Sequence, residues 1–221
     1  MKRLSALLIL LIFAAGCHHG IRSQIKGSGK RVSQKREVAA FTAISAEGAF
    51  NIEVTCQKDL SLEIEGDDNI LDSVSSEVTS NHVLRLKNNK EYSVSEPVTF
   101  KIAVPNLDGL TVLGAGHIDI KGVNNDKFEI DASGAPSISV AGTTKVVDID
   151  TTGAGKIDTY NLHATRAVVD SRGVSKVDLD VSEQLDVKIA GPSKVTYKGD
   201  PVVNKTINGP GKVERRTSEG A

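Results

Sequence analysis

Charged side chains recur at fixed distances from a series of glycines in the second half of the chain, and two kinds of chemistry could follow. Lysines stand three residues after four of these glycines, at Lys156, Lys176, Lys194 and Lys212. Acidic residues stand five residues after, at Asp158 and Asp178, and three residues before, at Asp131, Asp150 and Asp170. A repetitive charged surface could bind a repetitive polymer such as an envelope polysaccharide. The three aspartates before the glycines could instead hold Ca²⁺, or act as acid and base on a polysaccharide.

A solvated face explains the same pattern without any ligand, and we favour it as the simpler interpretation. Exposed ion pairs contribute only ~0–1 kcal/mol, and charged rows also discourage sideways aggregation of strands. No coil stands apart from the others, as a catalytic site would require. The chain also lacks the metalloprotease, nucleophile-elbow, phosphate-loop and dinucleotide signatures. We therefore predict no catalytic residue, no metal and no cofactor, with a polysaccharide lyase or hydrolase as the alternative.

The glycines themselves define the fold. Gly114, Gly134, Gly153, Gly173, Gly191 and Gly209 are separated by 20, 19, 20, 18 and 18 residues. A fixed period in this range is typical of a solenoid. Apolar residues alternate on both sides of each glycine, which indicates strands, and the leucine-rich repeat signature is absent. The sequence predicts an all-β, single-domain parallel β-helix with coils of about 18–20 residues, right-handed by the crossover rule.

The ends of this repeat differ from its middle. The same pattern surrounds Gly48 and predicts a seventh copy, whereas residues 67–108 break the period. We interpret 67–108 as an irregular insertion that covers one end of the stack, since terminal repeats are often atypical. The last coil places Lys205 and Arg215 at inward positions, which predicts an end face open to water.

The first residues have the composition of a targeting segment. Lys2 and Arg3 precede an apolar run from 4 to 13, which is too short to span a membrane. Small residues then lead to Cys17, and this pattern resembles a bacterial lipoprotein signal, although Ala14 replaces the usual leucine. We predict a signal peptide at 1–16 and a lipidated Cys17 carrying palmitate-type acyl chains. An ordinary secretory signal with an incidental cysteine is the alternative.

The remaining segments complete the predicted organisation. Residues 17–37 contain the lipidated cysteine and a basic tether, residues 38–215 form the repeat domain, and 216–221 form a tail. The residue after Cys17 is His18 rather than aspartate, which by the usual bacterial sorting rule favours the outer membrane. Cys56 continues an apolar alternation, so we expect a buried thiol and no disulfide. With 27 basic and 28 acidic residues, the chain lacks the basic excess of nucleic-acid binders.

Several stretches together resemble the GIN domain family, described as the head domain of auto-transporter adhesins. They are FTAISAEGAFNIEV, LSLEIEGDDNILDSV, VTFKIAVPNLDGLTVLGAGHIDI and the glycine-centred coils. The resemblance covers about residues 38–215 and implies a β-helical domain exported to the cell envelope. It supplies no catalytic residues. We therefore predict a lipid-anchored, adhesin-like or structural binding module of the bacterial outer membrane, on either of its faces. Its expected partners are the membrane and an envelope polysaccharide or another surface protein.

Overall fold

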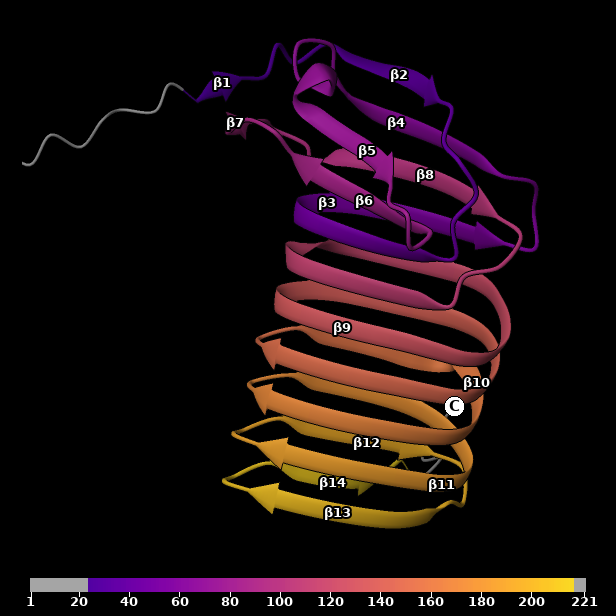
Figure 1. The fold of residues 1–221 in the computed structure, drawn as a ribbon. Helices are drawn as coiled ribbons and strands as arrows, with labels where there is room; N and C mark the ends of the chain where they lie inside the picture. The colour runs from indigo at the N-terminus through magenta and orange to yellow at the C-terminus, as the bar shows by residue number, and fades with distance from the viewer. Residues whose placement is uncertain (1–23, 217–221) are drawn as a thin grey trace, which may run out of the picture.

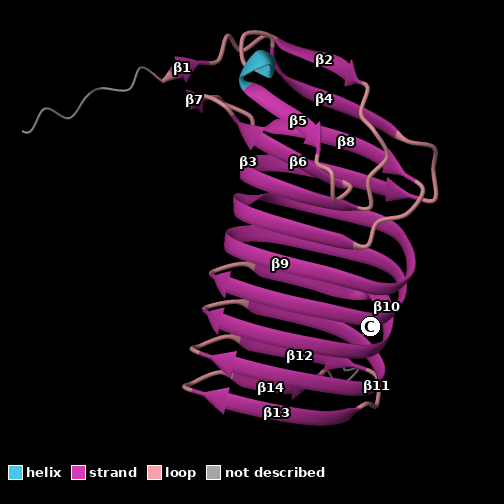
Figure 2. Cartoon of the chain, in the orientation of Figure 1, coloured by secondary structure: helices cyan, strands magenta, loops and turns pink. Residues whose placement is uncertain are grey.

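A computed structural model of the chain describes residues 24–216, and nearly all of its regular structure is β-strand (Figures 1 and 2). The one helical element in this range is a single 3₁₀ turn, η1 (Leu71–Ser73). The strands are β1 (Ile25–Lys26), β2 (Arg31–Arg36), β3 (Ala43–Cys56), β4 (Ser61–Asp67), β5 (Val74–Val78), β6 (Val83–Asn88), β7 (Tyr92–Ser93), β8 (Val98–Val104), β9 (Gly109–Gly153), β10 (Lys156–Gly173), β11 (Lys176–Ala190), β12 (Lys194–Lys198), β13 (Val202–Asn208) and β14 (Lys212–Arg215).

One sheet of twelve strands contains almost all of the domain. Its order is β14-β12-β11-β10-β9-β3-β8-β4-β2, with β13 beside β11 and the β5-β6 pair beside β3. Figure 1 shows the ribbon from β9 to β14 turning back on itself, each turn lying against the previous one. The separate pair β1-β7 lies beside this stack at its N-terminal end.

Parallel pairing aligns the glycine repeats. Within β10-β11, Lys156 lies opposite Lys176, and within β11-β12, Lys176 lies opposite Lys194, offsets of 20 and 18 residues. The early copy fits the same alignment, because Gly48 of β3 lies opposite Gly114 of β9. The copies around Gly48 and Gly114 are thus neighbours in space, even though the segment 67–108 separates them in the chain.

The apolar residues flanking each glycine fill the interior. Those predicted to point inward are buried, among them Phe128, Ile130, Ala132, Ile138, Val140, Leu185, Val187 and Ile189. Alternation puts every second side chain on the inner face, and stacked strands then pack these side chains against their copies. Cys56 is buried as expected, and burial raises the pKa of its thiol to about 11.

The sheet is mixed, so the prediction of a purely parallel fold is wrong for the N-terminal part. Strand β4 pairs antiparallel with both β2 and β8, and β5 pairs antiparallel with β6. Period-2 alternation specifies which face of a strand is buried, but says nothing about the direction of its neighbour. Residues 67–108, interpreted as irregular, contain η1 and the strands β5 to β8, and β8 continues the parallel stacking on β3.

The tether prediction needs correction from residue 24 onward. Strand β2 is part of the sheet and pairs with β4 from Arg31↔Asp67 to Arg36↔Leu62. Arg36 donates hydrogen bonds to the carbonyl oxygens of Val74 at 2.7 Å and Leu71 at 2.8 Å. These long-range contacts stabilise a basic strand that has no apolar periodicity. The predicted signal peptide, Cys17 and residues 217–221 of the tail lie outside the described residues.

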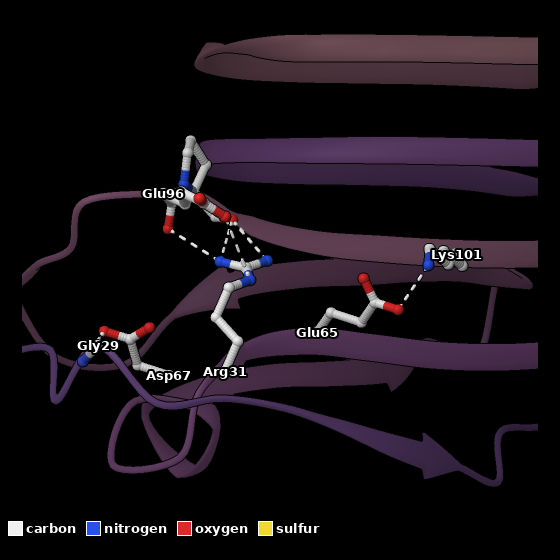
Figure 3. A network of polar contacts seen from close by, with 7 residues as sticks. Gly29, Arg31, Glu65, Asp67, Glu96 and Lys101 are labelled. Carbon is white, nitrogen blue, oxygen red and sulfur yellow. Dashed lines mark hydrogen bonds and ion pairs between the residues drawn. The ribbon is translucent and has the colours of Figure 1, made fainter.

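Ion pairs secure this N-terminal corner (Figure 3). Arg31 of β2 contacts the Glu96 carboxylate at 3.4 Å and donates to carbonyl oxygens of Glu96 and Pro97. On the neighbouring strands, Lys101 of β8 pairs with Glu65 of β4. Arg31 and Arg36, two of the basic residues of β2, thus have partners within the domain.

At the other end of the stack, Lys205 and Arg215 are exposed, as expected for a terminal coil. Arg215 donates to Asp200 at 2.9 Å. Among the described residues, β13 pairs only with β11 and β14 only with β12, so each leaves one backbone edge open. Charged side chains at inward positions of an open end oppose the addition of another strand.

Candidate functional site: a charged column beside a tyrosine cluster

The structure places the four predicted lysines in one column across adjacent strands. Lys156 lies opposite Lys176, Lys176 opposite Lys194, and Lys194 opposite Lys212. Neighbouring strands are about 4.8 Å apart, so the lysine column offers one ammonium group per strand at that spacing. All four residues are exposed. Such a column can contact successive charges on an extended anionic chain.

The acidic residues beside the lysine column are more buried than expected. Asp158 is half-buried, with its carboxylate 3.9 Å from Lys156. Asp178 is only 3% exposed and lies 3.0 Å from the Nζ atom of Lys176. The prediction of Asp178 as part of an accessible surface is therefore wrong. The buried Asp178 carboxylate pairs with the exposed Lys176 and is not accessible to a ligand.

At the C-terminal end of the column, an ion pair joins two coils. The Nζ atom of Lys194 lies 2.7 Å from the carboxylate of Glu214. This hydrogen bond raises the pKa of the lysine and lowers the pKa of the glutamate. Both groups are therefore charged across the neutral pH range.

A cluster that the sequence interpretation missed lies next to this end. Tyr160 of β10 has the Nζ atom of Lys198 5.9 Å from its ring centre and the guanidinium carbon of Arg216 at 5.0 Å. We call Tyr160, Lys198 and Arg216 the tyrosine cluster. Its members all stand seven residues after a glycine of the repeat, at Gly153, Gly191 and Gly209. The shared offset of seven residues could have predicted this third column from the sequence. It was missed because the column contains different residue types.

The acidic row formed by Asp131, Asp150 and Asp170 lies on the strand segments that precede the glycines. Asp150 and Asp170 are opposite each other on β9 and β10. Arg172 donates to both carboxylate oxygens of Asp150, at 2.7 and 2.5 Å, and its Nε atom lies 3.7 Å from Asp170. Asp131 is exposed and adds to the field at Arg172, whose pKa is raised chiefly by the hydrogen bond to Asp150.

This geometry commits two of the three carboxylates of the acidic row, Asp150 and Asp170, to ion pairs with Arg172. Within residues 24–216, no group of three or more histidine, cysteine, aspartate or glutamate side chains could hold a metal ion. A hollow lined by residues of β10, β11 and β13 includes Asp170. The second carboxylate in this hollow, Asp186, accepts hydrogen bonds from Gln184 and Asn204.

Comparisons with known proteins agree with this architecture. The profile of the family described as "Putative auto-transporter adhesin, head GIN domain" matches residues 40–201, and the chain belongs to this family. A crystal structure of a protein named a putative adhesin, from Bacteroides fragilis, superposes with a TM-score of 0.72 at 25% identity. The match covers 87% of this chain and all of the other.

Two further solved structures share the fold at lower identity. One, from Parabacteroides distasonis, is named a putative lipid binding protein, with a TM-score of 0.55 at 20% identity over 88% of this chain and 100% of that one. The other, from Parabacteroides merdae, is named a putative adhesin, with a TM-score of 0.50 at 16% identity over 88% and 99%. The search of curated proteins gave no match. In the part of the chain that the structure describes, no helix is long and apolar enough to cross a membrane.

Proposed function

We propose that this protein is an adhesin-like binding module of the bacterial cell envelope, and that its lysine column binds an anionic, repeating polymer such as an envelope polysaccharide. The observation that carries the proposal is the register of Lys156, Lys176, Lys194 and Lys212 on adjacent parallel strands. Family membership supports the adhesin-like role. Catalysis is not part of the proposal, because Arg172 already pairs with Asp150 and Asp170, two of the three carboxylates that an enzyme would use.

The scaffold that we infer for this role is a right-handed parallel β-helix, built from the parallel strands between β3 and β14. Register offsets of 18–20 residues and burial of alternate side chains support it. A helical scaffold of this kind keeps equivalent side chains at a constant spacing, which a repetitive ligand requires. A crystal structure in which successive coils wind to the left would contradict the assigned hand.

Polymer binding is expected to depend on the lysine column rather than on total charge. The variant Lys156→Gln/Lys194→Gln/Lys212→Gln spares Lys176, whose removal would leave buried Asp178 without its partner. We expect its affinity for polygalacturonate, measured by calorimetry, to fall about tenfold, because three surface contacts of ~0.5 kcal/mol each are lost. Raising the salt concentration should weaken wild-type binding, since exposed charges are screened.

The matched control removes three lysines from elsewhere, in the variant Lys127→Gln/Lys145→Gln/Lys188→Gln. It has the same net charge as the column variant, and we expect affinity within about twofold of wild type. Neutral dextran should not bind either protein. Equal losses in the two variants, or no binding of polygalacturonate by the wild type, would overturn the proposed role of the column.

Anchoring through Cys17 is the second part of the proposal, and His18 after it makes the outer membrane the proposed location. It rests on the signal-like residues 1–16 and on the position of Cys17. In cells fed a palmitate analogue, Cys17→Ser should abolish labelling and move the protein from the membrane to the soluble fraction. Cys56→Ala is the control, because Cys56 is buried and should keep both labelling and location. A Cys17→Ser variant that remains in the membrane fraction would refute the anchor.

A further inference from the structure

The tyrosine cluster extends the lysine column at its C-terminal end. The ring of Tyr160, which belongs to β10, contacts Lys198 at the end of β12 and Arg216 just after β14. These contacts therefore span the stack from β10 to the residue that follows β14. Arg216 is fixed in the same place by its backbone N–H, which donates to the Tyr197 carbonyl oxygen at 2.7 Å. Cations from two later coils are thus gathered on one aromatic ring.

The positions three, five and seven residues after the last three repeat glycines carry an excess of positive charge. At three, five and seven residues after Gly173, Gly191 and Gly209 stand Lys176, Asp178, Asp180, Lys194, Thr196, Lys198, Lys212, Glu214 and Arg216. Five of these nine side chains are cationic and three are acidic, a net excess of two positive charges. The earlier copies around Gly114 and Gly134 have His117, Asp119 and Lys121, or Ser137, Ser139 and Ala141, at the same offsets, with no such excess.

Within residues 24–216, the carboxylates in this region are paired with cations, whereas two of the cations have no carboxylate partner. Asp178 pairs with Lys176, Glu214 with Lys194, and Asp180 with both Lys198 and His163. Among residues 24–216, Lys212 and Arg216 have no carboxylate oxygen within 4.0 Å. Arg216 has an aromatic face as its partner, and this contact leaves the N–H groups of its guanidinium edge available.

We propose that the tyrosine cluster is the anion-binding subsite of the lysine column, where a carboxylate or phosphate group of the polymer docks. Arg216 offers the planar fork that matches either oxyanion with two hydrogen bonds, and Lys198 on the same ring adds charge beside it. Tyr160 is a positioning residue that holds Lys198 and Arg216 without neutralising them. This inference rests on the proposed function and names the charged group that this function requires.

The test uses the purified full-length protein with three probes: polygalacturonate, which carries carboxylates, long-chain inorganic polyphosphate, and neutral dextran. We expect Lys198→Gln/Arg216→Gln to lower the affinity for at least one charged probe by tenfold or more. Lys127→Gln/Lys145→Gln, which removes two exposed cations away from the cluster, should stay within twofold of wild type. The charged probe that loses affinity identifies the carboxylate or the phosphate as the group that docks here.

Two substitutions of Tyr160 form the second part of this test. Tyr160→Leu removes the ring and should lower affinity for the same probe at least fivefold, whereas Tyr160→Phe keeps the ring and should retain at least half of wild-type affinity. The midpoint of thermal unfolding is measured for each variant. This control distinguishes a loss of binding by a folded protein from a loss caused by unfolding. Equal affinities for the Leu and Phe variants would overturn the positioning role.

Failure of this subsite can be told apart from failure of the proposed function. If the wild type binds a charged probe and the triple lysine variant loses it, but Lys198→Gln/Arg216→Gln has wild-type affinity, the subsite is wrong and the lysine column stands. If the wild type binds neither charged probe, both proposals are overturned.

Discussion

Gly153→Ala is expected to lower the free energy of unfolding by about 2–6 kcal/mol, a large part of the ~5–15 kcal/mol that stabilises a typical domain. Gly153 has a backbone φ of +116°, a region that side-chain-bearing residues avoid at a cost of ~1–3 kcal/mol. A Cβ atom at this position would also lie 2.4 Å from the carbonyl oxygen of Gly134 in the preceding coil. Because that neighbour is backbone, it cannot move without displacing its own coil, which adds ~1–3 kcal/mol.

Gly29→Ala is the matched control for this prediction. Gly29 also has a positive φ, +76°, but an added Cβ atom would meet nothing within 4 Å. Only the conformational cost remains there, about 1 kcal/mol. Urea denaturation followed by circular dichroism gives the two values. If Gly153→Ala is no more destabilising than Gly29→Ala, the close backbone approach between stacked glycines does not exist in solution.

The glycine stack also explains how much of the fold could be predicted from the sequence. Spacing of the glycines identified which segments align, because the register pairs Gly48 with Gly114 and Gly153 with Gly173. A repeat encodes its own contacts, since each coil packs on a copy of itself. Alternation then identified the buried residues on both sides of each corner.

The parts that could not be predicted depend on contacts between unlike segments. Strand β2 has no apolar periodicity, and it forms because β4 offers an antiparallel edge and because Arg36 binds two carbonyl groups of η1 and β5. The direction of pairing among β4, β5, β6 and β8 likewise has no signature within any one strand. Strand pairing that depends on such contacts can be assigned only from the three-dimensional structure.

The candidate site shows the same division. Equal offsets from the glycines correctly placed Lys156, Lys176, Lys194 and Lys212 in one column. The offsets could not reveal that Asp178 is buried beside Lys176, or that Arg172 spans Asp150 and Asp170, because both facts depend on side-chain direction and length. The members of the tyrosine cluster share one offset from the glycines, but their contacts depend on the length of unlike side chains, which the offset does not reveal.

Phe100→Ala is expected to cost about 3–5 kcal/mol of stability, through lost apolar burial and the cavity left behind. Phe100 is 0% exposed and lies on β8, opposite Ile52 of parallel β3 and Ile64 of antiparallel β4. It therefore joins the parallel stack to the antiparallel part of the sheet. Its ring meets the edge of the Phe50 ring at a centroid distance of 5.2 Å and an angle of 85°.

Which strands are destabilised by Phe100→Ala tests the architecture more sharply than the total loss of stability. In a stack of coils, each element is stabilised mainly by its neighbours, so Phe100→Ala should loosen the N-terminal end first. We expect hydrogen exchange to accelerate in β2, β4 and β8 while β10 and β11 stay protected. Val174→Ala, at a side chain that is 61% exposed, should change stability by less than about 0.5 kcal/mol.

A double-mutant cycle with Phe50→Ala separates the ring contact from simple burial. Edge-to-face aromatic pairs contribute about 0.5–1.5 kcal/mol beyond the area that they bury, so the two single losses should sum to more than the loss in the double variant by that amount. Strict additivity would show that the rings only fill space. Uniform acceleration of exchange from β2 to β14 would instead show that the mixed sheet unfolds as one unit, and that β8 does not mark a boundary within it.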